Sequence, residues 1–310
     1  MSASGTSAAV APTATQASLG GVLLAAGGAI AFSGKAIIVK LGYRYGVDAV
    51  TLLALRMLVA LPCFAAMALW AARSAPPLQA GDRWRIVALG VLGYYLASFL
   101  DFLGLAYITA TLERLILYLT PTLVLLIGVL LWRRRPQRRQ LWALALSYLG
   151  VLLAFGHDLQ IGGARTAWGS LLVFGSALAY AAYLVGSGQL VARVGAVRLT
   201  AYASLVACAL CIAQFLLRPL HALVLPTPVY ALSLLNGTLC TAVPVLATML
   251  AVQRIGSALA SQIGMLGPVS TIVLSVLVLG EAMGPWQIAG TVLVLGGVLL
   301  VSRPVRARSA

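Results

Sequence analysis

The feature that most constrains the fold of this sequence is a succession of apolar segments, each near the roughly 20 residues that a helix needs to cross a bilayer. Of the 310 residues, 62% are hydrophobic and only 9% are charged, whereas about a quarter of the residues in a soluble domain are charged. We therefore predict an all-α integral membrane protein. Its ten transmembrane helices are expected at residues 18–40, 49–71, 85–106, 111–132, 140–156, 168–190, 199–217, 229–252, 257–279 and 286–302.

The net charge of +15 would suggest a nucleic-acid partner in a soluble protein, but here the placement of the basic residues matters more than their sum. Most of them fall on one side of the predicted topology, at 73–85, 133–139, 193–198, Arg254 and 303–308. The positive-inside rule makes that side cytoplasmic. We expect no nucleic-acid partner, and we predict a multi-pass protein of the bacterial cytoplasmic (inner) membrane with both termini in the cytoplasm.

The chain divides into four parts. Residues 1–17 are mostly Ser, Ala and Thr without Lys or Arg, so they lack the positive region of a signal peptide and are predicted to be a disordered tail that is not cleaved. Residues 18–156 and 157–302 are each predicted to form five helices, and residues 303–310 a basic tail.

These two five-helix parts repeat each other. The segment LLAAGGAIAF at 23–32 aligns with LLVFGSALAY at 171–180, and Pro121 aligns with Pro268 at an offset of 147 residues. Because five is an odd number of spans, the two repeats must enter the membrane from opposite sides. Inverted repeats are typical of secondary transporters. The paired prolines interrupt helical hydrogen bonding and are candidate pivots, with a purely structural kink as the alternative.

Small residues mark one face of the last helix in each repeat. Gly290 and Gly297 lie seven residues apart, as do Ala143 and Gly150. Such faces let helices approach closely. Packing within one chain is the simpler interpretation, and a homodimer through span 5 (140–156) and span 10 (286–302) is the alternative.

Ionisable residues inside the spans are the main candidates for a functional site. At a rise of about 1.5 Å per residue, five of them lie in the outer leaflet of the first repeat, and the second repeat does not copy them. Charges of both signs at one depth can pair across helices, and one positive charge remains in excess, which favours an anionic or zwitterionic ligand. A gate and a closed structural lock are both compatible with this pattern. The five residues are Lys35, Arg56, Asp101, Glu113 and Arg114.

Aromatic and polar side chains extend this candidate substrate-binding or gating site. Tyrosine rings that line a cavity suit organic solutes through stacking or cation–π contact, although a Tyr in a span is more often a core or interface residue. The additional candidates are Tyr94, Ser98, Tyr118, Tyr180, Tyr183 and Gln262.

Motifs for enzyme chemistry fail on inspection. Cys208 and Cys211 form a CxxC pair within an apolar span, where free Cys behaves as a small hydrophobe. The glycines flanking residues 29–33 have the wrong spacing for a phosphate-binding loop, and His157 and His221 are isolated. We expect no catalytic residue, metal or cofactor.

Several stretches resemble the EamA family of the drug/metabolite transporter superfamily over residues 18–302. They are FSGKAIIVK, TLLALRMLVALP, LDFLGLAYITATLERLILYLTPTL and ALASQIGMLGPVSTIVLSVLVLGEAMGPWQIAGTVLVLGGVLL. Pro268, Gly280 and Glu281 stand where the family pattern expects them, whereas Arg133 and Arg134 replace the Gly-Glu often found after span 4. The resemblance implies ten helices, a central cavity lined by spans 1, 3, 4, 6, 8 and 9, and export of metabolites such as amino acids.

Together these features predict a secondary active transporter that exports small organic metabolites, anionic or zwitterionic, by alternating access. Its expected partners are a small-molecule substrate and membrane lipids. Asp101 or Glu113 could take up a proton during the cycle, since burial favours the neutral form of an unpaired carboxylate. A lipid or polyprenyl-linked carrier of similar fold and a passive facilitator or channel remain open, and a membrane-embedded enzyme is the least favoured alternative.

Overall fold

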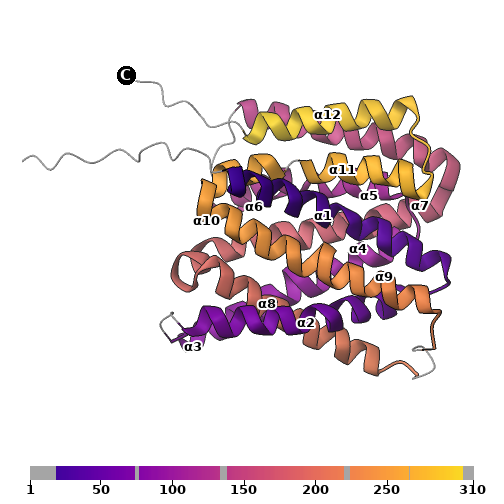
Figure 1. Ribbon diagram of the computed structural model, residues 1–310. Helices are drawn as coiled ribbons and strands as arrows, with labels where there is room; N and C mark the ends of the chain where they lie inside the picture. Colours follow the sequence, from indigo (N-terminus) through magenta and orange to yellow (C-terminus); the bar gives the residue numbers. More distant parts are fainter. Residues whose placement is uncertain (1–18, 74–76, 133–137, 220–223, 265, 303–310) are drawn as a thin grey trace, which may run out of the picture.

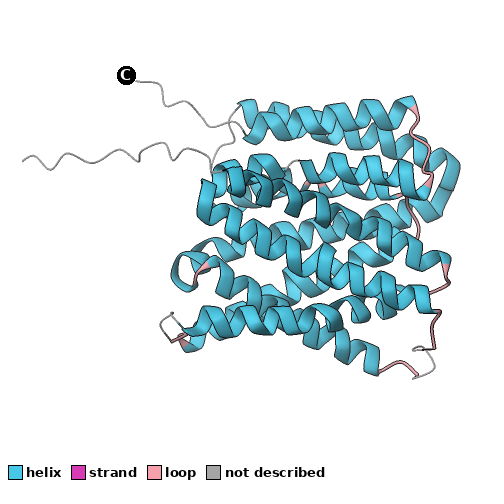
Figure 2. Ribbon diagram, in the orientation of Figure 1, coloured by secondary structure: helices cyan, strands magenta, loops and turns pink. Residues whose placement is uncertain are grey.

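The computed structural model describes residues 19–73, 77–132, 138–219, 224–264 and 266–302, and within these ranges it contains helices and short connections but no strand (Figure 2). The helices of the first repeat are α1 (Leu19–Arg44), α2 (Ala49–Arg73), α3 (Ala80–Gly90), the π-helical η1 (Val91–Leu96), α4 (Ala97–Leu105), α5 (Ala110–Leu117), α6 (Thr120–Trp132) and the beginning of α7 (Arg138–Val194). The second repeat continues with the rest of α7, α8 (Ala196–Leu216), α9 (Thr227–Gly237), the π-helical η3 (Thr238–Ala242), α10 (Val243–Gly264), α11 (Leu266–Leu274), the π-helical η4 (Ser275–Leu279) and α12 (Pro285–Ser302).

These elements account for the ten predicted spans. Seven helical stretches in the described ranges are long and apolar enough to cross a membrane. Two shorter apolar helices, Leu144–Asp158 and Val269–Leu279, occupy the positions of spans 5 and 9, and α12 that of span 10. Spans 3 and 4 are each assembled from consecutive helices: α3, η1 and α4 in one, and α5 and α6 in the other.

The predicted boundaries differ from the structure at three places. Span 3 begins with α3 at Ala80 rather than at residue 85, and α10 continues through Arg254, where we predicted a turn between spans 8 and 9. The helix of span 5 also runs through the predicted polar connection as far as Gly163 (φ 56°, ψ −139°). No proline interrupts that connection, so polar composition alone does not end the helix, whereas the left-handed backbone of a glycine does.

Packing between the repeats shows their two-fold relationship. α1 packs against α10 and η3, and the corresponding part of α7 packs against α4 and η1. α2 packs on α8, α5 on α11, and α7 on α12, so each of these pairs joins a span to its counterpart in the other repeat. α1 begins and α12 ends at the same end of the helix bundle (Figure 1). The main helix contacts between the repeats therefore occur in symmetry-related positions.

Two of the small residues predicted on spans 5 and 10, Gly150 and Gly290, lie in the α7–α12 contact, whereas the side chain of Ala143 lies outside those that the structure describes. A Cβ atom on Gly150 would be 2.5 Å from the carbonyl oxygen of Gly290, and a Cβ on Gly290 would be equally close to the carbonyl oxygen of Gly150. Only residues without a side chain allow the two backbones to approach so closely. These two glycines therefore pack within one chain, and the homodimer through spans 5 and 10 stays a prediction.

The two π-helical segments η1 and η3 occupy equivalent positions in the repeats. The first residues of these segments, Val91 and Thr238, are separated by the same 147 residues that relate Pro121 to Pro268. A π-helical turn widens the helix by one residue and is frequent at functional sites. It also changes which side chains face the interior, so helical spacing alone does not predict them.

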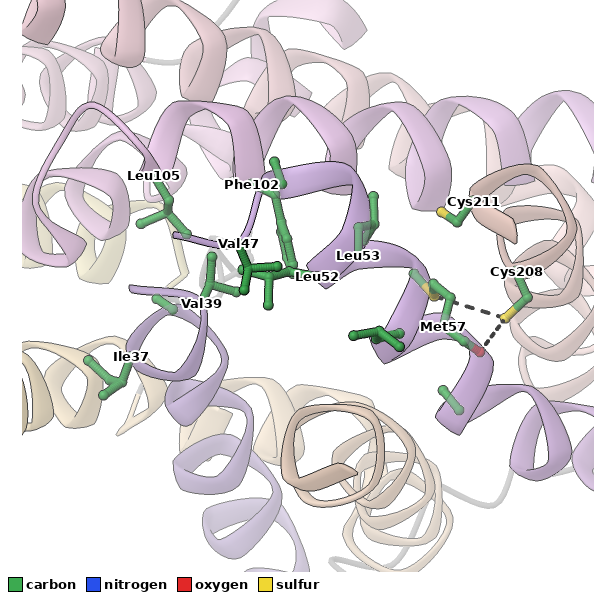
Figure 3. Close-up of a cluster of buried hydrophobic side chains, with 14 of the residues drawn as sticks. Ile37, Val39, Val47, Leu52, Leu53, Met57, Phe102, Leu105, Cys208 and Cys211 are labelled. Atoms are coloured by element: carbon green, nitrogen blue, oxygen red, sulfur yellow. Dashed lines mark hydrogen bonds between the residues drawn. The ribbon is translucent and has the colours of Figure 1, made fainter. Parts of the chain in front are cut away.

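A large apolar cluster joins α2 and α4 of the first repeat to α8 of the second. Leu53, Met57 and Phe102 contribute to it, together with Cys208 and Cys211 (Figure 3). The Cys208 Sγ atom lies 3.5 Å from the Met57 carbonyl oxygen and 3.9 Å from its Sδ atom. Both cysteines are free thiols packed as core residues.

Candidate functional site

Four ionisable side chains from three helices form one buried network. The Lys35 ammonium of α1 lies 2.5 Å from Asp101 Oδ2 of α4 and 3.7 Å from Glu113 Oε1 of α5. The Arg114 Nε atom lies 3.7 Å from Glu113 Oε2. Two carboxylates therefore share the Lys35 ammonium, and the chain of charges runs from Asp101 through Lys35 and Glu113 to Arg114. We refer to these four residues as the ionic network.

The ionic network is screened from both water and lipid. Glu113 is completely buried, and the other three members are between 2% and 7% exposed. Removing a charge from water costs several kcal/mol, so mutual pairing is a condition for burying them. Several of their polar atoms have no hydrogen-bond partner among the described residues: Asp101 Oδ1, Glu113 Oε1 and Oε2, and Arg114 Nε and Nη2. The network thus retains unused hydrogen-bonding capacity.

Arg56 lies close to the ionic network but is not part of it. It projects from α2, is 6% exposed, and donates from Nε to Thr241 Oγ1 at 2.8 Å. Its guanidinium carbon is 5.4 Å from the ring centroid of Phe102, the residue after Asp101. Among the ion pairs of the described residues, none includes Arg56.

The short helix α5 holds Glu113 and Arg114 in place, and both of its N-terminal caps come from side chains. Thr109 accepts from the Leu112 amide at 3.1 Å. Glu281, in the connection before α12, accepts from the Ala110 amide at 2.8 Å and from the Thr111 amide at 3.2 Å. A carboxylate at a helix N-terminus satisfies free amides and complements the helix dipole. Glu281 therefore positions a first-repeat helix from the second repeat.

Further polar contacts tie the repeats together at the same end of the molecule. Thr111 Oγ1 and Ser275 Oγ are 2.9 Å apart, and Arg44 donates to the Leu279 carbonyl at 2.7 Å. Gln287 donates to Asp158, at the end of the span-5 helix that closes the first repeat, at 2.7 Å. These contacts and those of Glu281 form what we call the outer tie, named for the predicted topology.

One ion pair links the repeats at the opposite end. Arg193, near the end of α7, pairs with Asp82 of α3 and also donates to Gln79 Oε1 at 3.3 Å. The Asp82 side chain is largely buried, whereas that of Arg193 is half exposed. Both ends of the interface between the repeats thus carry polar contacts.

Three of the four predicted tyrosines form a second cluster apart from the charges. Tyr94 of η1 and Tyr183 of α7 meet edge to face with centroids 5.2 Å apart, and Tyr180 stacks on Tyr183 at 5.6 Å. Tyr94 precedes Asp101 by seven residues, about 10 Å along a helix. Gly93 makes room for this cluster, because a Cβ there would lie 2.2 Å from the Tyr183 ring.

The remaining predicted residues are dispersed. Ser98 is half-buried on α4 between Tyr94 and Asp101. Tyr118 is buried at the end of α5, and its hydroxyl has no partner among the described residues. Pro121 is exposed in the first turn of α6, just after the break that separates it from α5. Gln262 and Pro268 lie outside the residues whose side chains the structure describes.

Sequence reasoning missed the residues that complete this region. Thr241 holds Arg56, and Phe102 stacks against it, yet neither carries a sequence signal beyond an ordinary apolar span. The Phe32 ring lies 5.6 Å from the Lys35 ammonium. Glu281 was visible as part of a family pattern, but only the fold shows that it caps α5.

A fold of two inverted five-helix repeats around buried ionisable side chains defines the class of multi-pass membrane transporters. The EamA-like transporter family matches residues 19–156 and, a second time, residues 167–303. The chain belongs to this family, as its resemblance predicted, and it is a membrane transport protein for small solutes.

Two relatives agree with this assignment, and one solved structure agrees with the fold. The uncharacterized transporter YcbK of Bacillus subtilis (strain 168) is 30% identical over 284 residues, which cover 88% of each chain. The uncharacterized transporter YyaM of the same organism is 24% identical and covers 71% of this chain and 73% of its own. A crystal structure of a protein 18% identical superposes with a TM-score of 0.59 over 91% of this chain and 96% of the other, which supports the fold alone.

Proposed function

We propose that this protein is a secondary active transporter that exports small organic metabolites, amino acids or related anionic or zwitterionic solutes, across the bacterial cytoplasmic membrane. The transport class follows from the family, whereas the substrate class, direction and mechanism are the content of the proposal. Both termini are placed in the cytoplasm because basic connections favour that side.

The observation that carries the proposal is the ionic network on α1, α4 and α5. Lys35, Asp101 and Glu113 come from three helices, the Lys35 ammonium lies within 4 Å of both carboxylates, and all three side chains are buried. Intramembrane charges are costly to retain and mark solute or ion pathways in membrane proteins. Together with Arg56 and Arg114, these residues amount to three cationic and two acidic side chains. The excess of one positive charge favours solutes that carry a negative group.

Alternating access is supported by the contacts between the repeats. The outer tie joins α1 and α5 to the segment from η4 to α12, and the Asp82–Arg193 pair joins α3 to α7 at the other end. If one repeat rocks against the other, either the outer tie or the Asp82–Arg193 pair breaks while the other stays intact. Such contacts can act as gates because each consists of a few polar interactions rather than a large apolar surface.

Counterflow in proteoliposomes tests the proposal. Vesicles loaded with one unlabelled amino acid at a time are diluted into the same labelled compound, and a carrier accumulates label transiently above equilibrium. For export, cells that express the protein should release more of that solute than cells without it. Saturable counterflow supports the proposal. Flux without saturation or counterflow would indicate a facilitator, and movement of a labelled lipid between leaflets would indicate a lipid carrier.

A further inference from the structure

The excess positive charge of the buried site can be assigned to one residue. Lys35 and Arg114 engage Asp101 and Glu113, so both carboxylates of the ionic network already have cationic partners. Arg56, only 6% exposed, is left without a carboxylate. Its Nη1 atom is buried and has no hydrogen-bond partner among the described residues. A guanidinium stays protonated in proteins, so this charge persists unless an anion joins it.

Contacts with the second repeat fix the position of Arg56. Its Nε atom donates to Thr241 Oγ1 at 2.8 Å, and the Thr241 hydroxyl in turn donates to the Asn236 carbonyl at 2.7 Å. A Cβ on Gly237 would lie 2.7 Å from the Arg56 carbonyl oxygen, so α9 and α2 touch through their backbones here. The guanidinium is thus held in advance, with one edge used by the protein and Nη1 unused.

The surroundings of Arg56 strengthen an electrostatic contact. The Phe102 ring covers the guanidinium at 5.4 Å, and the neighbouring Leu53, Met57 and Cys208 belong to the apolar cluster (Figure 3). In such a low-dielectric region, a charge-assisted hydrogen bond is stronger than in water. The planar guanidinium matches the geometry of a carboxylate better than a lysine ammonium does.

We propose that Arg56 binds the carboxylate of the transported solute and that Thr241 positions the Arg56 side chain. This inference rests on the proposed transport function and adds the group that the solute must carry. The residue before Phe102 is Asp101, whose Oδ1 atom is also buried without a partner among the residues described, so an ammonium on the same solute has an acceptor nearby. α-Amino acids carry both groups.

Thermal shift of the purified full-length protein provides the first readout. The probes are the twenty proteinogenic amino acids, their carboxamides, and acetate, propionate and benzoate. Wild-type protein should be stabilised by at least one carboxylate, and the matching carboxamide should give no shift. If the twenty amino acids and three acids all fail to shift the melting temperature, or if a carboxamide shifts it as much as its acid, the proposal is wrong.

Three arginine substitutions test whether binding of the carboxylate depends on Arg56. Arg56→Gln should weaken binding of the active carboxylate by at least about 30-fold, as expected for removing one partner of a buried charge pair. Arg56→Lys keeps the charge and should weaken it by about 10-fold because the planar fork is lost. Arg198→Gln is the matched control, since Arg198 is likewise a buried arginine over an aromatic ring, that of Tyr202, but lies in the first turn of α8, and this variant should bind like the wild type.

Thr241→Val keeps the question answerable if Arg56 variants do not fold. It removes only the hydroxyl that holds Arg56 Nε and should weaken carboxylate binding without changing the preference for acid over carboxamide. Unchanged affinity in Thr241→Val and in any folded Arg56 variant would overturn the proposal. Counterflow distinguishes failure of this inference from failure of the transport function. If the wild type transports only amines or neutral solutes, the protein is still a transporter, but Arg56 does not bind a solute carboxylate.

Discussion

At the residue scale, each buried charge of the ionic network depends on its partner, because a single charge left unpaired in the interior would destabilise the fold. Lys35 has two carboxylates within 4 Å, and Asp101 Oδ2 at 2.5 Å is the nearer. Breaking a buried pair leaves an uncompensated charge, whereas replacing both partners by apolar residues of similar volume is often neutral. This asymmetry separates a structural lock from a functional gate.

We predict that Asp101→Asn lowers the free energy of unfolding by about 3 to 5 kcal/mol, and that Lys35→Met with Asp101→Leu recovers most of it. Thermal unfolding and counterflow are measured on the same preparations. If the double variant regains both stability and counterflow, the pair is only a lock; recovery of stability without counterflow identifies a gate or site.

Arg218→Gln is the control for this experiment. The Arg218–Asp48 pair, at 3.6 Å, has both side chains nearly half exposed. Exposed pairs contribute at most about 1 kcal/mol, so both readouts should stay near those of the wild type. A loss comparable to that of Asp101→Asn would show that the assay does not distinguish buried pairs from exposed ones.

At the scale of single elements, α5 depends on a residue far away in the chain. The helix contains eight residues, too few to be stable alone, and it carries Glu113 and Arg114. Glu281 satisfies two of its N-terminal amides from a distance of about 170 residues along the chain. The second repeat therefore helps to fold the helix that carries the charges of the first.

Glu281→Ala should lower the free energy of unfolding by about 1 to 2 kcal/mol, since two amides lose their acceptor and the helix dipole loses its countercharge. Glu281→Gln keeps one carbonyl oxygen and should lose less. The measurement is thermal unfolding, with counterflow as the second readout because the ionic network sits on the same helix. Equal effects of the two variants would argue against capping by the carboxylate.

Glycines at helix crossings define another element-scale constraint. A Cβ on Gly104 of α4 would lie 2.8 Å from the Gly169 carbonyl oxygen and 2.4 Å from Val173 Cγ2, both on α7. The backbone atom cannot move aside without shifting a helix. Gly27 of α1 instead has no atom within 4 Å of a built Cβ.

Gly104→Ala is therefore expected to lower stability by about 1 to 3 kcal/mol through overpacking. Gly27→Ala, the matched control, should be neutral or stabilising by up to about 1 kcal/mol, because Ala is the better helix former. Thermal unfolding of the two variants tests the α4–α7 contact, and an unaffected Gly104→Ala would mean that these helices are not so close.

At the scale of the whole molecule, two symmetric repeats carry an asymmetric site. The contacts between α1 and α10 and between α4 and α7 are equivalent by symmetry, yet the ionic network belongs to the first repeat. The second repeat contributes Thr241 and Glu281 as supports. Motion between the repeats would therefore act on charges that are mostly fixed to one of them.

Cross-linking the outer tie tests this motion. Thr111 and Ser275 have hydroxyl oxygens 2.9 Å apart and lie in opposite repeats, so cysteines there are close enough for a disulfide. In a Cys63→Ala background, where the remaining native thiols are buried, the oxidised double variant should lose counterflow and dithiothreitol should restore it. Each single cysteine variant is the control, and full counterflow in the cross-linked protein would exclude opening at this end.

From the sequence alone we could predict the membrane class, the number of spans, the repeat and five of the buried charged residues, although not Asp82 and Arg198. Apolar length and charge are local properties, and a bilayer forces them into helices because backbone groups must be paired within the segment. The resemblance to the EamA family rested on such local patterns and was confirmed. The excess of one positive charge likewise followed from counting the five predicted residues.

Which charges pair, and which residue keeps the excess positive charge, became visible only in the folded chain. Lys35, Asp101 and Glu113 meet because three helices cross, and Arg56 is left to Thr241, a residue of a π-helical turn that helical spacing cannot anticipate. The separation of the tyrosines from the charges and the capping of α5 by Glu281 also depend on long-range packing. These outcomes depend on interatomic distances between segments remote in the chain, and composition does not encode them residue by residue.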